Sequence, residues 1–275
     1  MDQKIKDGSG ETWNWTINGN VATSGGRLDE MEKMPESNAT ITKGSLTVYE
    51  YGLSIPFTSK VQMLGKQDVE DMVDNALADD AKKVLDSEVR DQFDDSPLIA
   101  VGTAAGTATA SNVTFETDGT PSNTNNAGLD KYHVQAIVDW MKERNIPTFS
   151  DGDYFCIGRP TSFRVLKNQL ESVSQYTDAG FRKIMNGEQG RYEGCRFLEQ
   201  TNIASQSWSN SKSDVCHFFG KDTVAEAVVV PEEIRGKIPD DYGRGNGMAW
   251  YALLGFGLVR SAAADATIVR WESDS

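Results

Sequence analysis

The stretch KQDVEDMVDNALADDAKKVLDSEVRDQF, Lys66 to Phe93, has the residue spacing of one long amphipathic helix. Its apolar side chains recur at intervals of three and four residues, which places them on one helix face. They are Val69, Met72, Val73, Ala76, Leu77, Val84, Leu85 and Val89. At ~1.5 Å per residue such a helix is about 40 Å long, more than a domain of this size usually needs. The sequence therefore predicts an unusually extended element.

The acidic run inside this helix is most simply its solvated face. Asp74, Asp79 and Asp80 lack the ligand spacing of a calcium-binding loop. We therefore predict no metal site on the helix.

Strand-like alternation precedes the helix. In a first stretch Trp13, Trp15 and Ile17 share one parity with polar residues between them, which is typical of a strand with one apolar face. A second stretch resumes the alternation, and a change of parity predicts a bulge or twist near Val48. After it, one parity carries Tyr49, Tyr51, Leu53, Ile55 and Phe57. We expect one extended hairpin over residues 12–58 that has little of its own to pack on.

The elements after the helix follow no regular alternation of strand and helix. Residues 101–128 have the composition of a loop, with one short strand at Val113 to Phe115. Further helices are predicted at Leu129 to Asn145, at Pro160 to Leu166 and at Asp178 to Met185, and strands at 153–158, 195–203, 214–220, 248–261 and 266–271. This mixed order favours an α+β fold over a doubly wound sheet.

Charge and composition exclude several function classes. The 275 residues carry 27 Lys and Arg against 41 Asp and Glu, a formal charge of -14, which is the wrong sign for gripping phosphate backbones. The thiols of Cys156, Cys195 and Cys216 are odd in number and form no C-x-x-C pair, so we expect neither disulfides nor a zinc knuckle. The sequence has no signal-peptide core and no window of ~20 apolar residues, so we expect a soluble cytoplasmic protein without membrane contact.

No catalytic motif emerges from the residues. Gly187, Gly190 and Gly194 lack the G-K-[ST] end of a phosphate loop, and no G-x-S-x-G nucleophile elbow occurs. His133 and His217 have no Ser or Cys partner in motif context, so each is interpreted as a packed or surface imidazole. We predict no catalytic residue, no cofactor and no metal.

The aromatic residues Trp13, Trp15, Tyr49 and Tyr51 lie in extended elements whose apolar faces are hard to satisfy within one domain. Such faces are commonly buried against neighbouring subunits, so these four residues are candidates for inter-subunit contact. The same side chains could equally pack across the hairpin from one another. Both interpretations stay open from the residues alone.

A turn late in the chain carries a family resemblance. It has the pattern GE-x-G-x-x-x-G-x-RF before a strand ending in TN, with Gly187, Glu188, Gly190, Gly194, Arg196, Phe197, Thr201 and Asn202. In this pattern, and in the order of segments over nearly the whole chain, the sequence resembles the major capsid proteins of tailed bacteriophages (Caudoviricetes). The matching segments are Glu50 to Thr58 with the return arm of the family's E-loop, Lys66 to Phe93 with its spine helix, Asp153 to Lys167 with its strand-Pro-helix segment, and Pro239 to Ser261 with its axial loop and long strand.

This resemblance implies the tailed-phage capsid fold, an α+β fold with an E-loop hairpin, a peripheral (P) domain with a long spine helix, and an axial (A) domain. The implied division is a residual N-terminal arm at 1–11, the E-loop hairpin at 12–58, P domain at 59–100 with the spine helix at 66–93, A domain at 101–170, a return to the P domain at 171–214, A domain at 215–260 with the axial loop at 231–247, and a C-terminal P-domain strand at 261–275.

The resemblance also implies a non-enzymatic subunit that self-assembles into hexamers and pentamers of an icosahedral head enclosing double-stranded DNA. Implied partners are further copies of the chain, portal, scaffold and decoration proteins, with DNA only by non-specific proximity. The implied location is the virion capsid, assembled in the bacterial host cytoplasm. Inter-subunit contact is expected at the four aromatic residues above, at a Glu188–Arg196 ion pair and at Arg244.

Three other interpretations remain. One is an encapsulin-like nanocompartment shell of the same fold, which the contents of the particle would distinguish. Another is a nucleotide-binding or hydrolytic enzyme that uses the loop DDYGRGNG, Asp240 to Gly247, which predicts a small oligomer with ligand binding. The last is a binding module whose hairpin adds to the edge of a partner's sheet.

Overall fold

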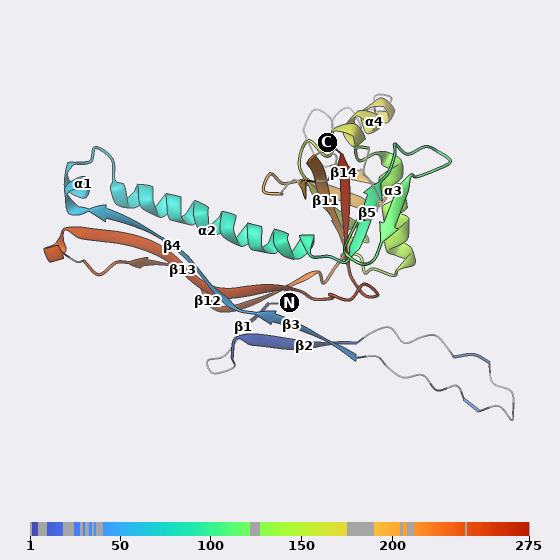
Figure 1. Ribbon diagram of the computed structural model, residues 1–275, viewed down its shortest axis with the longest axis horizontal. Coiled ribbons are helices and arrows are strands. Elements are labelled where there is room, and N and C mark those ends of the chain that lie inside the picture. Colours follow the sequence, from blue (N-terminus) through green and yellow to red (C-terminus); the bar gives the residue numbers. More distant parts are fainter. Residues whose placement is uncertain are drawn as a thin grey trace.

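Two bodies and a projecting hairpin make up the computed structural model of the chain (Figure 1). The structure describes residues 2–4, 10–18, 25–27, 30, 33–34, 36, 41–121, 127–174, 190–203, 206–207, 212–239 and 241–274. The strands are β1 (Asp2–Lys4), β2 (Thr12–Asn18), β3 (Ile41–Thr47), β4 (Tyr49–Thr58), β5 (Leu98–Gly102), β6 (Val113–Glu116), β7 (Tyr154–Gly158), β8 (Arg191–Tyr192), β9 (Cys195–Glu199), β10 (Gln206–Ser207), β11 (Lys212–Phe219), β12 (Val224–Gly236), β13 (Gly245–Leu258) and β14 (Ile268–Asp274). The helices are α1 (Ser59–Leu64), α2 (Val69–Asp94), α3 (Lys131–Glu143), α4 (Arg164–Ser174) and the short 3-10 helix η1 (Asp241–Gly243).

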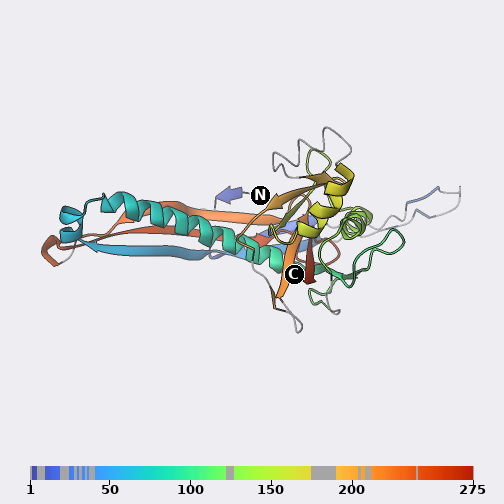
Figure 2. The ribbon, with the colours of Figure 1, turned by 90° about the horizontal axis from the view of Figure 1, so that it is seen from above.

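The first body, called here the long layer, is a four-stranded sheet covered on one face by α2. Its strand order is β1-β12-β13-β4, and α2 runs along the sheet for most of its length (Figure 2). The predicted helix at 66–93 is confirmed as a helix of 26 residues. It begins after Asp68, whose carboxylate caps the first turn by accepting from the Glu70 N–H at 3.0 Å.

Most of the predicted apolar face of α2 packs on the long sheet, whereas Met72 and Ala76 of that face are exposed. Val73, Leu77 and Ala81 are buried in one cluster with residues of β13. Those residues are Trp250, Ala252 and Leu254. The acidic run is only partly solvated, because the Trp250 indole Nε1–H donates to Asp80 Oδ2 at 2.9 Å. The long helix therefore has a long sheet of its own chain to cover.

The second body, called here the compact domain, is built on an eight-stranded sheet. Its order is β6-β5-β14-β11-β7-β9-β8, with β10 paired to β11. Helix α3 supplies Val134, Ile137, Val138 and Met141 to the core, and strands supply Cys156, Phe218 and Trp271. The predicted helix at 129–145 and the short strand near Val113 are observed, whereas β5 includes residues that were expected to begin a loop. Helix α4 starts later than Pro160 and extends beyond Leu166.

The hairpin consists of β2 and β3 only. Trp13 pairs with Leu46 in an antiparallel register, whereas β4 pairs with β13 and belongs to the long layer. The expected hairpin over residues 12–58 therefore ends at Thr47. The Val48 N–H still donates to the Glu11 carbonyl at 2.9 Å, which continues the β2–β3 register, and from Tyr49 onward the chain pairs with β13 instead. Strand pairing therefore changes partner between Val48 and Tyr49, next to the residue where a bulge or twist was predicted.

The segments near the C-terminus are grouped differently from the division expected from the resemblance. β12 and β13, within 215–260, form the long layer together with β4 and carry residues 231–247 away from the compact domain. β14, within 261–275, lies between β5 and β11 in the compact domain. β9, within 171–214, and β11, which crosses the expected boundary between 214 and 215, share that sheet. The helix expected at 178–185 lies outside the described residues.

Three described connections join the long layer to the compact domain: 95–97, 220–223 and 259–267. On the compact side they leave from neighbouring positions, because Phe219 pairs with Ile268, and Val269 pairs with Leu98. On the side of the long layer, the ends of two connections are also neighbours, because Val224 of β12 pairs with Leu258 of β13. All three connections therefore cross side by side, at the C-terminal end of α2. No helix among the described residues has the length and apolarity to span a membrane.

Candidate assembly surfaces

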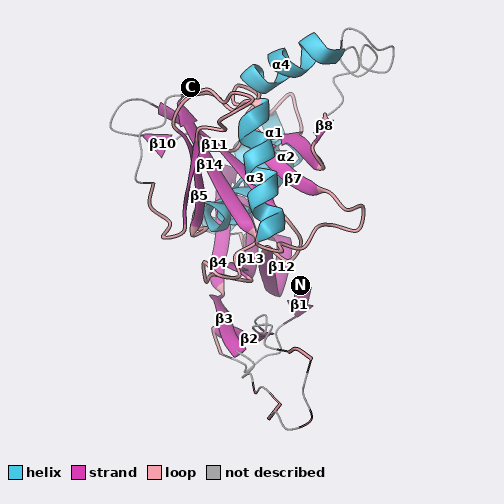
Figure 3. Cartoon of the chain, turned by 90° about the vertical axis from the view of Figure 1, so that its right-hand side faces the viewer, coloured by secondary structure: helices cyan, strands magenta, loops and turns pink. Residues whose placement is uncertain are grey.

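The base of the hairpin packs on the long layer of its own chain. The hairpin and α2 lie on opposite faces of the long sheet (Figure 3). β3 approaches β13 at two glycines: a Cβ atom on Gly255 would lie 2.3 Å from the Thr47 carbonyl oxygen, and one on Gly257 would lie 2.8 Å from Leu46 Cβ. Only residues without a side chain allow two backbones to come this close.

Trp13 and Trp15 lie at this base. Their rings are 5.0 Å apart between centroids, and both pack on the cluster around Leu46. The Trp15 indole N–H donates to the Val259 carbonyl at 3.1 Å, and the ring covers Gly44, where a Cβ would lie 2.3 Å from it. Both tryptophans are half-buried. Their contacts within the chain account for part of their apolar surface, and the rest is open to a neighbour.

Tyr49 and Tyr51 have different surroundings on β4. The Tyr51 hydroxyl donates to Glu88 Oε2 of α2 at 3.1 Å. Burial, followed by the nearby Glu88 carboxylate, raises the pKa of Tyr51 to about 12. Tyr49 remains 60% exposed. Tyr51 therefore connects helix to sheet, and of the two only Tyr49 offers most of its surface to a partner.

Arg196 is paired within its own chain. Its guanidinium donates to Asp153 Oδ2 and to Asp151 Oδ2, each at 2.8 Å, and Arg191 donates to the other oxygen of Asp153 at 2.6 and 3.0 Å. Burial alone would raise the pKa of Asp153, but the hydrogen bonds from Arg196 and Arg191 outweigh it and lower that pKa. Glu188, the partner expected from the resemblance, lies outside the described residues.

The glycine-rich turn before this cluster is a tight hairpin. Tyr192 pairs with Cys195, so Glu193 and Gly194 form a two-residue loop, with φ of 51° and 76°. Two successive positive φ values are those of a type I′ turn, which matches the twist of the flanking strands. The turn therefore serves strand pairing rather than phosphate binding.

Arg244 lies at the far end of the long layer, where the chain reverses between β12 and β13. Its side chain is 80% exposed and lies 3.6 Å from Asp241. Its carbonyl accepts from the backbone N–H of Ser59 at 3.0 Å, which attaches α1 to this turn. The turn itself has φ of 47°, 55° and 85° at Asp241, Tyr242 and Gly243.

This end of the long layer, called here the distal tip, exposes large apolar side chains that sequence reasoning did not single out. They are Val61, Met63 and Leu64 of α1 together with Ile234, Ile238 and Tyr242. Ile238 is 88% exposed and Tyr242 is fully exposed. Large apolar side chains gathered at one exposed end of a protein are typical of an interaction site. A groove of 690 Å³, lined by residues such as Ile55, Val61 and Met72, lies beside it.

A polar contact that was not predicted from the sequence joins the long layer to the compact domain. The Asn202 amide donates to Asp86 Oδ2 at 2.7 Å and to Ser87 Oγ at 3.2 Å, and Gln200 donates to the same Asp86 carboxylate at 3.1 and 3.3 Å. The Arg90 guanidinium donates to the backbone carbonyl of Asn202 at 3.2 Å. Asp86, Ser87 and Arg90 are spaced as neighbours on one helix face. That spacing was the available sequence signal.

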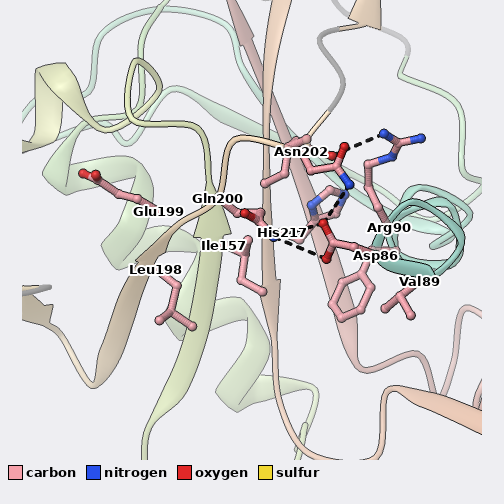
Figure 4. Close-up of a pocket in the computed structure, with 11 residues that line it drawn as sticks. Asp86, Val89, Arg90, Ile157, Leu198, Glu199, Gln200, Asn202 and His217 are labelled. Carbon is pink, nitrogen blue, oxygen red and sulfur yellow. Dashed lines mark hydrogen bonds between the residues drawn. The ribbon is translucent and has the colours of Figure 1, made fainter. Parts of the chain in front are cut away.

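A cavity of 290 Å³ lies beside this contact, between α2 and strands β7, β9 and β11 (Figure 4). Apolar lining comes from Val89, Phe93, Ile157, Leu198 and Ile203. His217 Nε2 lies at its edge, 2.8 Å from Asp94 Oδ1.

The histidines and acids of the described chain form no recognised catalytic or metal arrangement. His133 Nε2 lies 2.9 Å from the Ala104 carbonyl, and His217 contacts Asp94 as above. Within the described ranges no group of three or more His, Cys, Asp or Glu side chains could hold a metal ion. The cysteines there are free and buried.

Comparison with known proteins gives a consistent result. A family model described as "Phage capsid protein" matches residues 43–268. Similar solved structures are the capsid of Ralstonia phage GP4 (TM-score 0.71, 12% identity, 99% of this chain and 87% of that chain), a capsid of Helicobacter pylori bacteriophage KHP30 (0.69, 12%, 99% and 87%) and the capsid of cyanophage P-SCSP1u (0.67, 12%, 100% and 86%). No curated protein matches the sequence significantly.

Proposed function

The chain belongs to the phage capsid protein family, and on this premise we propose that it is the major capsid protein of a tailed phage, whose copies assemble into the hexamers and pentamers of an icosahedral head. The observation that carries the proposal is the family match over residues 43–268, joined to a capsid fold over the whole chain. Membership in the branch defined by the turn between Gly187 and Phe197 is part of the proposal.

In the proposed assignment the long layer with α2 corresponds to the P domain, the compact domain to the A domain, and β2–β3 to the E-loop. Residues 1–11 correspond to the remaining N-terminal arm. The exposed distal tip and the projecting hairpin support a role in contacts between copies, because each leaves apolar side chains partly uncovered. Arg244 and Tyr49 lie on such exposed surface, and we assign them to these contacts.

Double-stranded DNA is the proposed content of the shell, held by proximity only. A formal charge of -14 disfavours tight binding to phosphates and leaves packaged DNA free to move. Portal, scaffold and decoration proteins are proposed partners, the virion capsid is the proposed location, and assembly in the host cytoplasm is proposed with it. We assign the chain a structural and not an enzymatic role.

The alternative within the same fold is a nanocompartment shell that encloses protein cargo. The family match favours the phage capsid, and the contents of a purified particle distinguish the two. Shells whose enclosed nucleic acid is protected from nuclease until the shell is opened support the phage head. Shells that hold a co-purifying enzyme support the nanocompartment.

The test of assembly is negative-stain electron microscopy of the purified protein together with sedimentation velocity. Uniform shells tens of nanometres across, or stable hexamers and pentamers, are the expected result. A chain that stays monomeric near 30 kDa when portal and scaffold proteins are co-expressed would refute the proposal.

A further inference from the structure

We propose that Asn202 and Gln200 are positioning residues that fix the angle between the long layer and the compact domain, and that this angle sets the curvature of the shell. The second half of this inference rests on the proposed function. The first half concerns the isolated subunit and stands without it.

The covalent connections alone leave this angle open. All three cross side by side at the C-terminal end of α2, which is the arrangement of a hinge. A restraint on rotation must act away from that line. Asp86 is eight residues before Asp94, so the contact with Asn202 lies about 12 Å along the helix from the crossing.

The contact has the directionality that a restraint requires. The side-chain amide of Asn202 donates to Asp86 and Ser87 of α2, and Arg90 of α2 donates to the backbone carbonyl of Asn202. Hydrogen bonds to charged groups are short and angle-dependent, so they specify one relative position. The loop that bears Asn202 is itself fixed to the compact domain, because Gln200 N–H donates to the Gly158 carbonyl at 2.9 Å.

The space beside the contact is not filled by side chains. The cavity of 290 Å³ lies between Val89 of α2 and Ile157 and Leu198 of the compact domain (Figure 4). A close-packed apolar interface would resist rotation by itself, whereas an interface with a void leaves room for movement. At the crossing itself Phe93 packs edge-on against His217 and Phe219, and His217 contacts Asp94. Farther from the crossing along α2, the hydrogen bonds of Asn202 and Gln200 hold the two bodies together.

The experiment measures the angle directly in the unassembled subunit. Spin labels are attached at Asp79→Cys on α2 and Lys142→Cys at the end of α3, both exposed positions, while the native cysteines are buried. Distance distributions are recorded by pulsed electron paramagnetic resonance for the labelled wild type, Asn202→Asp, Asp86→Asn and the double variant Asp86→Asn/Asn202→Asp. Asn75→Asp is the matched control, since Asn75 is exposed on the same helix and bonds only to Asp71 within it.

The expected result follows from charge. In Asn202→Asp two carboxylates face each other, so the narrow spin-label distance distribution expected for the wild type should broaden. In the double variant the amide at position 86 donates to the carboxylate at position 202, so the narrow distribution should return. The control keeps the wild-type distribution. Equal widths in all variants would overturn the positioning role, and failure of the double variant to recover would assign the effect to general loss of structure.

Particle diameters then test the link to curvature. Asn202→Asp is expected to produce shells of several diameters or open sheets, and the double variant uniform shells. If Asn202→Asp forms shells of one diameter, equal to that of the wild type, although its spin-label distance distribution is broadened, the link between angle and curvature is refuted. If the wild type forms no shells at all, the proposed function fails while the distance measurement still decides the positioning role.

Discussion

Gly255→Ala tests the close approach of hairpin and long layer. The added methyl carbon would lie 2.3 Å from the Thr47 carbonyl oxygen, and ordinary contact begins at 3.4 Å, so β3 must move away by the difference, 1.1 Å. The obstacle is backbone, which cannot rotate aside as a side chain can. Overpacking of this kind costs about 1–3 kcal/mol, and the reduced entropy of the unfolded chain returns about 0.4–1 kcal/mol. We expect a net loss of roughly 1–2 kcal/mol of unfolding free energy.

The assay is urea unfolding of the unassembled subunit, with hydrogen exchange at β2 and β3 as a local readout. Gly236→Ala is the control, because Gly236 also lies in the long layer, lacks a positive φ, and has nothing within 4 Å of its added Cβ. That variant should gain stability slightly. If Gly255→Ala proves as stable as Gly236→Ala, and its hairpin amides exchange at wild-type rates, the reasoning about close backbone approach is refuted.

Three further outcomes are expected. Asp153→Asn should destabilise the subunit by about 1–2 kcal/mol at neutral pH, because the half-exposed guanidinium groups of Arg191 and Arg196 lose their charged partner. Since the folded-state pKa of Asp153 is lowered, the advantage of the wild type should persist above pH ~4 and vanish as pH falls through that lower value, as urea unfolding at several pH values would reveal. Tyr51→Phe should cost about 1 kcal/mol and remove from the ultraviolet titration a tyrosine whose pKa is raised to about 12, whereas loss of a tyrosine that titrates at the ordinary value of 10.0 would contradict the Glu88 contact. Ile238→Asp at the exposed distal tip should change subunit stability by less than about 0.5 kcal/mol yet reduce assembly seen by sedimentation, whereas normal assembly would remove the tip from the proposed contacts.

The sequence predicted elements better than it predicted their partners. The periodicity of α2 depends only on neighbours three and four residues away, so its existence and extent could be predicted. The alternation of β4 indicated a strand with an apolar face but carried no information on whether β2 or β13 would pair with it. The parity change near Val48 was the one local sign of the change of partner, which falls between Val48 and Tyr49.

Site residues were harder to predict because their partners lie far away in the chain. Arg196 binds Asp153, 43 residues earlier, and Asn202 binds Asp86, 116 residues earlier. Neither pairing can be derived from periodicity, which relates only residues a few positions apart in the chain. The distal tip escaped notice for another reason: the short stretch SKVQMLG reads as an ordinary amphipathic turn, and only the fold shows that none of its residues is buried.

The side-by-side crossings give the subunit a mechanical property. With its only covalent supports at one end of α2, the long layer acts as a lever arm about 40 Å long, so a rotation of about 5° at the supports displaces the far end by about 3.5 Å. That displacement is as large as the spacing between atoms in contact. Small rearrangements near Asp94 are thus amplified into the making or breaking of contacts at Ile238 and Tyr242.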